Sequence, residues 1–211
     1  MIKEVEAEAE LLDYLENSEL NVATSARLTH SDKSPAELQE EMSEEKIGKM
    51  ARHMVDLGHE STLENSFYYF KVRCSRVASH QVVRHRIGVS VAQRSQRYVT
   101  EDDFEFIVPP TIKENEAEYE MFLDQMEYSR NLYEHYRDEG IPKEDARFIL
   151  PQIATYMTLG FNARALRHFI ELRYSFSAQW EIRQLAEQML EQVKEVTPNL
   201  FHDFELQEES N

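Results

Sequence analysis

The segment FYYFKVRC, residues 67–74, constrains the fold more than any other stretch because its apolar residues alternate with a period of two. Tyr68, Phe70, Val72 and Cys74 fall on one face of such a segment, and the residues between them fall on the other. This alternation predicts a strand with one buried face. Cys74 shares the apolar face, where a free thiol is typical of small core filler rather than of a nucleophile.

Three other segments carry apolar residues at the spacing of amphipathic helices. The first begins at Ser43, which can cap it, and is expected to end near Gly58. The second spans 115–139, and the third spans about 178–193 with Ser177 as its N-cap. Their apolar stripes are, in order, Ile47, Met50, Ala51 and Met54; Tyr119, Phe122, Met126, Tyr133 and Tyr136; and Ile182, Leu185, Ala186, Met189 and Val193.

The remaining segments give weaker signals. Residues 1–8 are expected to form a short strand or a frayed helix, and 31–43 a polar connection with a turn of helix at its start. Residues 148–173 are aromatic and β-branched and turn helical near Asn162. Because no repeat, low-complexity tract or interdomain linker is visible, we expect a single domain over residues 1–211.

The charge balance limits the partners of this chain. Forty acids against 23 Lys and Arg give a formal net charge of −17, which disfavours a general nucleic-acid or anionic-membrane surface. With no long apolar run and no secretory pattern at its start, the chain is expected to be cytoplasmic. Between Asn65 and Thr100, however, there is no acid, and this basic segment contains Lys71, Arg73, Arg76, Arg84, Arg86, Arg94 and Arg97.

The basic segment is centred on the triplet Arg84, His85 and Arg86. Successive helical residues point about 100° apart, so these three side chains can face one ligand only where a helix ends in a loop. Guanidinium groups suit phosphate and the carbonyl edges of a pyrimidine or flavin ring. The alternative is a solvated network of ion pairs with the abundant acids of the chain. Small residues that let a backbone approach a ligand follow: Gly88, Ser90 and Ser95.

A second polar cluster downstream favours a shared anion site over two solvated faces. It comprises Asn162, Arg164, Arg167, His168 and Arg173. His80 and His85, five residues apart, lack cysteine or carboxylate neighbours at ligand spacing, so no metal site is expected. The chain has neither GxGxxG nor a P-loop, so a Rossmann domain is not indicated.

Together, GHES (58–61), RHR (84–86), SQRY (95–98) and FNARALRHFIELR (161–173), followed by AQWEI, resemble the flavin-dependent thymidylate synthase family. The resemblance extends from about residue 20 to 200. Eight residues separate Arg86 from Ser95, one more than is usual in the family, and Gln93 stands where many members have Glu.

This resemblance implies reductive methylation of dUMP to dTMP, with methylenetetrahydrofolate as one-carbon donor, FAD as redox carrier and NADPH as reductant. It also implies an α+β fold, with helices packed on a small, mainly antiparallel sheet and no Rossmann domain. Family members form homotetramers with FAD and dUMP at subunit junctions, and the same assembly is expected here. No cysteine nucleophile is expected.

Site residues follow from the same resemblance. It implies dUMP contacts from Gln81, Arg84, Ser95, Gln96, Arg97, Arg147 and Arg173. It implies FAD contacts from Ser61, Glu64, Arg84, His85, Arg86, Asn162, Arg164 and His168. Arg173 is similar to a catalytic residue that stabilises negative charge at N3 and O4 of the uracil, a role suited to a fixed cation.

Two other classes of function remain open at this stage. One is a nucleotide-binding or regulatory protein that keeps the fold without the chemistry, which the longer spacer before Ser95 motivates. The other is a small nucleic-acid-binding module built on the basic segment, which the net charge disfavours.

Overall fold

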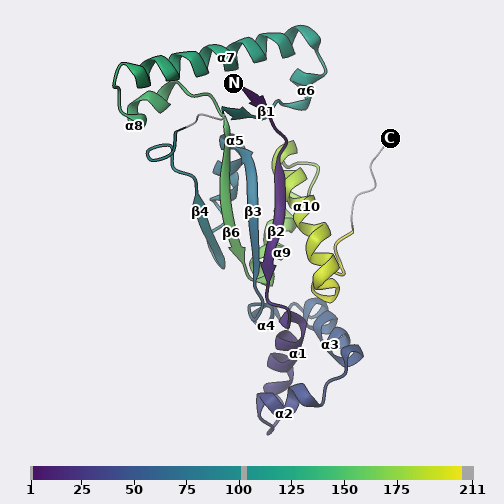
Figure 1. The fold of residues 1–211 in the computed structure, drawn as a ribbon. Helices are drawn as coiled ribbons and strands as arrows, with labels where there is room; N and C mark the ends of the chain where they lie inside the picture. Colours follow the sequence, from purple (N-terminus) through teal and green to yellow (C-terminus); the bar gives the residue numbers. More distant parts are fainter. Residues whose placement is uncertain (1, 101–103, 206–211) are drawn as a thin grey trace.

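The computed structural model describes residues 2–100 and 104–205, and it is organised around a four-stranded antiparallel sheet. The strand order is β2 (Glu8–Tyr14), β3 (Tyr68–Ser75), β6 (Ala154–Phe161) and β4 (Val89–Gln93). Figure 1 shows these strands running lengthwise through the middle of the molecule. The fold is therefore α+β, as expected.

Strand β3 is central and confirms the alternation seen in the sequence. Tyr68, Phe70, Val72 and Cys74 are all fully buried. The strand pairs with β2 on one side and with β6 on the other, in a register that runs from Tyr68 opposite Phe161 to Ser75 opposite Ala154. Cys74 is part of the main hydrophobic core, which confirms its role as core filler.

Helices α9 (Ala163–Arg173) and α10 (Trp180–Val196) pack on one face of the sheet, close to the short helix α5 (Arg76–Val82). Helix α10 also covers the edge strand β2. The side-chain oxygen of Gln192 accepts the Leu11 N–H at 2.6 Å, and its amide donates to the Ala9 carbonyl at 2.8 Å. These bonds occupy backbone groups that an edge strand otherwise leaves unpaired.

A helical unit lies at one end of the sheet (Figure 1) and contains α1 (Ser18–Leu28), α2 (Pro35–Glu40), α3 (Glu44–Asp56) and α4 (Glu60–Leu63). Helix α3 confirms the predicted helix after Ser43, although the Ser43 side chain makes no capping bond. The predicted turn of helix within 31–43 is α2, which starts at Pro35 because Ser34 and Glu37 form a capping box.

The opposite end of the sheet carries a second, smaller core beneath the long helix α7 (Glu116–Asp138). Strands β1 (Lys3–Glu4) and β5 (Glu105–Phe106) pair there in parallel. Short helices flank α7: α6 (Pro110–Lys113), α8 (Lys143–Ala146) and the 3-10 turn η1 (Arg147–Ile149). A second 3-10 turn, η2 (Pro198–Leu200), follows α10. Helix α7 confirms the predicted helix 115–139, and Asn115 caps it.

Two predictions about local structure need correction. Ser177 does not cap the last helix, which begins at Trp180 because the Gln179 side-chain oxygen accepts the Ile182 N–H at 3.1 Å. The Ser177 hydroxyl bonds the Ser175 hydroxyl instead. The helical alternative for residues 1–8 is wrong, since the segment contains β1 and the start of β2.

Glu181 is a buried carboxylate that joins α10 to the junction of β3 and α5. It is 1% exposed and accepts the Ser75 N–H at 2.5 Å and the Ser75 hydroxyl at 2.6 Å. Burial raises the pKa of Glu181 above its ordinary value, and the bonds from Ser75 oppose that shift. The same Ser75 hydroxyl accepts the Ala78 N–H and caps α5, so Glu181 holds the residue at which α5 begins.

We expect Glu181→Ala to lower the free energy of unfolding by about 1–3 kcal/mol, because the Ser75 N–H loses its acceptor in a buried place. Glu181→Gln keeps a carbonyl acceptor and should lose less. Urea denaturation at pH 7 measures both.

The pH dependence gives a second check on Glu181. Since its pKa is raised in the folded state, the folded chain binds more protons here than the unfolded chain, and this contribution to stability falls as pH rises above 4.5. Glu181→Gln should remove that part of the pH slope. An Ala variant as stable as the parent chain would contradict the proposed contact.

Candidate active site

The loop that follows α5 carries the triplet Arg84, His85 and Arg86. Helix α5 ends at Val82, so the triplet lies at a helix end, as the sequence predicts. Gly88 closes the loop with a φ of +71°, a conformation that favours glycine. A Cβ atom at Gly88 would lie 2.9 Å from the Asn162 side-chain nitrogen, so the loop and the start of α9 are in close contact.

His85 connects this loop to the far end of α9. The Arg173 Nε–H donates to His85 Nε2 at 2.9 Å, and the His85 ring packs against Phe169 with centroids 4.9 Å apart. Burial, and after it the charges of Arg173 and His168, together lower the pKa of His85 to about 4. His85 is therefore neutral at neutral pH, with Nε2 as the acceptor and the proton on Nδ1.

Some cations of the basic segment do form ion pairs with acids, as the alternative interpretation predicts. Arg73 lies 3.3 Å from Glu8, Arg97 lies 3.0 Å from Glu144, and Lys71 pairs with Glu10. These are cations on or beside the sheet that meet acids from other segments. Such exposed pairs contribute little to stability.

The guanidinium groups around His85 are different. Across residues 2–100 and 104–205, no carboxylate lies within ion-pair distance of Arg84, Arg86 or Arg173. Burial and the nearby Arg84 hold the pKa of Arg173 below its usual range. A chain of net charge −17 thus leaves these cations without anionic partners, which is the electrostatic requirement for an anion site.

Helix α4 and the first turns of α9 bring together most of the residues predicted to contact FAD. Arg164 lies 2.7 Å from Glu64 and 3.0 Å from Glu60. The Asn162 side chain caps α9 by accepting the Ala165 N–H at 2.8 Å. The His168 ring lies 6.2 Å from that of His85, so the loop after α5 belongs to the same region.

A hollow of about 960 Å³ lies beside this region, and both Ser61 and Arg164 line it. Its other walls come from α1, α3 and the turn before α4, including Met54, Leu57 and His59. Its size and mixture of apolar and polar groups match those of ligand pockets.

The residues predicted to contact dUMP do not all come together within one chain. Arg84 and Arg173 lie at the loop before β4 and Gln81 lies on α5, whereas Ser95, Gln96 and Arg97 follow β4. A five-residue strand spans about 17 Å. Arg147 lies with the second group, because its Nε–H donates to the Glu144 carbonyl at 3.1 Å while the Glu144 carboxylate pairs with Arg97.

The long spacer between Arg86 and Ser95 contains β4. Gln93 at its end donates to the Ser79 hydroxyl at 3.1 Å, which ties β4 to α5. Arg94 lies over the Tyr156 ring at 4.3 Å. Gln93, which stands where many family members have Glu, therefore has a structural contact within its own chain.

Glu60 lies in the candidate site, in the wall of the hollow, and the sequence analysis missed it. It is the second carboxylate on Arg164, and its spacing of four from Glu64 places both on one face of a helix. This spacing of four between two glutamates was the feature of the sequence that could have indicated Glu60.

Cys74 lies in the hydrophobic core, away from the residues described above. Burial raises the pKa of Cys74 to about 12, so the thiol stays protonated at neutral pH. No group of three or more potential ligand side chains in the described part of the chain could hold a metal ion.

We expect the His85 ring to titrate near pH 4 in NMR spectra rather than near 6.5. Because its folded pKa is lowered, the stability that His85 contributes is complete above pH 6.5 and is lost as pH falls toward about 4. Protonation would place a proton on Nε2 and break the bond from Arg173. The His85→Gln variant identifies the resonance, and a midpoint at or above 6.5 would contradict the buried, neutral ring.

Comparisons with known proteins identify the family. The family model described as thymidylate synthase complementing protein matches residues 10–199. A flavin-dependent thymidylate synthase from Geobacter sulfurreducens is 42% identical over 197 residues, which cover 92% of this chain and 84% of the relative. One from Clostridium tetani is 38% identical over 217 residues, covering 94% and 87%.

A solved structure also shares the fold. The UMP/dUMP methylase PolB from Streptomyces cacaoi, bound with 5-Br dUMP, superimposes with a TM-score of 0.83 at 23% identity, over 95% of each chain. The matched sequences extend through the loop after α5, α4 and α9. This chain belongs to the flavin-dependent thymidylate synthase family.

Proposed function

We propose that this protein converts dUMP to dTMP, with methylenetetrahydrofolate as the one-carbon donor and NADPH as the source of reducing equivalents for bound FAD. The observation that carries the proposal is that Arg84, Arg86 and Arg173 have no acidic partner in the described chain, while a neutral His85 accepts a bond from Arg173. Family membership supplies the reaction to which this anion site belongs.

The residues around α4 and α9 fit FAD. When bound, FAD carries hydride from the nicotinamide to the nucleotide. Arg164 and the Ser61 hydroxyl line the hollow as donors, and apolar side chains from α3 complete its wall. Gly88 lets the backbone approach a ligand closely. We assign FAD contacts to Ser61, Glu64, Arg84, His85, Arg86, Asn162, Arg164 and His168.

Arg173 is the proposed catalytic residue. Its Nε–H is occupied by His85, so the two terminal nitrogens of the guanidinium remain available for a ligand. A cation fixed at N3 and O4 of the uracil stabilises the negative charge that develops there and makes C5 and C6 more reactive. His85 is a positioning residue, because it accepts a bond from Arg173 only while its ring is neutral.

The separation of the dUMP residues by β4 supports a site completed between subunits. We propose a homotetramer in which Ser95, Gln96, Arg97 and Arg147 of one subunit meet Arg84 and Arg173 of another. Large apolar side chains near both groups are exposed: Ile87 at 91%, Tyr98 at 74%, Phe148 at 83% and Phe176 at 78%. Exposed apolar surface of this kind is typical of interfaces.

Residues 1–211 are proposed to act as one domain in the cytoplasm. The match over residues 10–199 supports the single domain, and a lone cysteine suits a reducing compartment. Among helices of the described residues, none has both the length and the apolar character needed to cross a membrane.

Arg173→Ala should leave bound FAD in place and lower dTMP formation by about 10²–10³-fold, the range seen when a single charge-stabilising donor is removed from an active site. Flavin absorbance and turnover of dUMP measure the two effects separately. Arg167→Ala is the matched control on the same helix, since Arg167 is held by Asp203 and not by His85. Normal turnover in Arg173→Ala would remove this residue from the mechanism.

Gly88→Ala tests the contact between the loop and α9. It should lose stability, because φ is positive, and should also displace Asn162 and weaken FAD binding. Gly140→Ala is the control, with a φ of +80° and no atom within 4 Å of the new Cβ. FAD titration and thermal melting distinguish them: equal losses of FAD affinity in both variants would contradict the role of this contact.

A further inference from the structure

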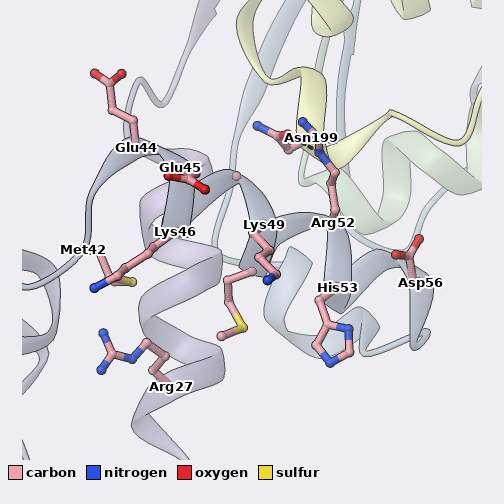
Figure 2. A pocket seen from close by; sticks show the side chains of 12 residues that line it. Arg27, Met42, Glu44, Glu45, Lys46, Lys49, Arg52, His53, Asp56 and Asn199 are labelled. Atoms are coloured by element: carbon pink, nitrogen blue, oxygen red, sulfur yellow. Dashed lines mark hydrogen bonds between the residues drawn. The ribbon is translucent and has the colours of Figure 1, made fainter.

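A second hollow, of about 870 Å³, lies along α3 and is not used by the proposed chemistry. It is bounded by α3, by Arg27 from α1 and by Asn199 from η2. Figure 2 shows the ends of Arg27, Lys46 and Lys49 and the ring of His53 on one side of α3, whereas Arg52 is directed toward Asn199. The spacing of 46, 49 and 53 places these residues on one helical face.

The two arginines of this hollow and its Asp56 already have partners. Arg52 donates to Asn199 at 2.6 Å, and Arg27 lies 3.7 Å from Glu41, which also pairs with Lys33. Asp56, one of the acids in the wall, contacts His202 at 3.0 Å. Glu44 and Glu45 also line the hollow and are exposed.

Lys46 and Lys49 differ from these groups. Within the described residues, no hydrogen bond or ion pair holds either ammonium group. Like charges three or four residues apart destabilise a helix slightly. A chain with forty acids and 23 Lys and Arg nevertheless lines this hollow with two lysines that no acid holds, although Glu45 stands four residues before Lys49; this favours an anionic ligand.

This hollow adjoins the one assigned to FAD. Arg27, Met50 and His53 line both. The larger hollow continues to Ser61 and Arg164, the proposed flavin contacts. A long ligand could therefore hold its anionic end at Lys46 and Lys49 while its other end approaches the flavin.

We propose that Lys46 and Lys49 bind the phosphate groups of the phosphorylated nicotinamide dinucleotide that reduces the flavin. This inference rests on the proposed function, for which it names the docking site of the reductant. Lysines bind phosphate as point charges, and the two arginines of the hollow, whose planar forks bind carboxylate or phosphate through paired bonds, are already engaged.

The test compares the double variant Lys46→Gln and Lys49→Gln with the control Lys3→Gln and Lys113→Gln. The control removes the same charge from exposed lysines at the other end of the molecule, on β1 and α6. Calorimetry with adenosine 2′,5′-bisphosphate reports binding without turnover. Anaerobic rapid mixing of the FAD-loaded protein with NADPH or NADH reports flavin reduction.

We expect the Lys46 and Lys49 variant to bind adenosine 2′,5′-bisphosphate roughly ten- to a hundredfold more weakly, as loss of charge-assisted bonds predicts. The concentration of NADPH needed for half-maximal reduction should rise by a similar factor, and that of NADH by less. FAD content and melting temperature should match those of the parent protein, because the control variant also breaks the ion pairs of Lys3 and Lys113.

Three results would overturn the inference. Unchanged binding of the bisphosphate would show that the lysines hold no phosphate. Loss of FAD would mean that they hold the diphosphate of FAD. A defect confined to folates with an extended γ-glutamyl tail would identify carboxylates as the ligand. The proposed function can also fail separately. If the parent protein forms no dTMP, but only the Lys46 and Lys49 variant loses binding of adenosine 2′,5′-bisphosphate, the proposed function is wrong and the phosphate site is supported.

Discussion

The antiparallel pairing of β6 with β3 and β4 is the constraint on which the site depends. Strand β3 leads into α5 and the loop with Arg84, and β6 leads through Asn162 into α9 and Arg173. Because Val89 pairs with Phe161, Gly88 necessarily lies beside Asn162. A shift of one residue in this register would reverse the faces of β4 and separate the loop from α9.

Electrostatics explains how an acidic chain can bind anionic ligands. Its acids neutralise the cations along the sheet, as at Arg73 and Arg97, but do not approach those around His85. A neutral His85 adds no further positive charge and holds Arg173 by a hydrogen bond instead of an ion pair. The guanidinium group is thereby oriented without being neutralised, which is what stabilisation of a developing negative charge requires.

Strong local patterns predicted the elements that bury one full face. Residues 67–74 and 115–139 gave β3 and α7 because alternation and helical spacing are visible without any partner. Strand β4 was not predicted, since Ser90, Val91 and Ala92 are all exposed and its pattern lacks alternation. Strand β2 was missed in part because Gln188 and Gln192 of a distant helix complete its hydrogen bonds.

The sequence by itself determined the family, the α+β class, the basic segment and the types of residue that form the candidate site, because these are properties of composition and order. Only the tertiary structure decided which arginines are neutralised, that His85 accepts a bond from Arg173, and that β4 divides the predicted dUMP residues into two groups. The reason is physical: pairing of charges, burial and strand register depend on contacts between segments far apart in the chain, and no local pattern records them.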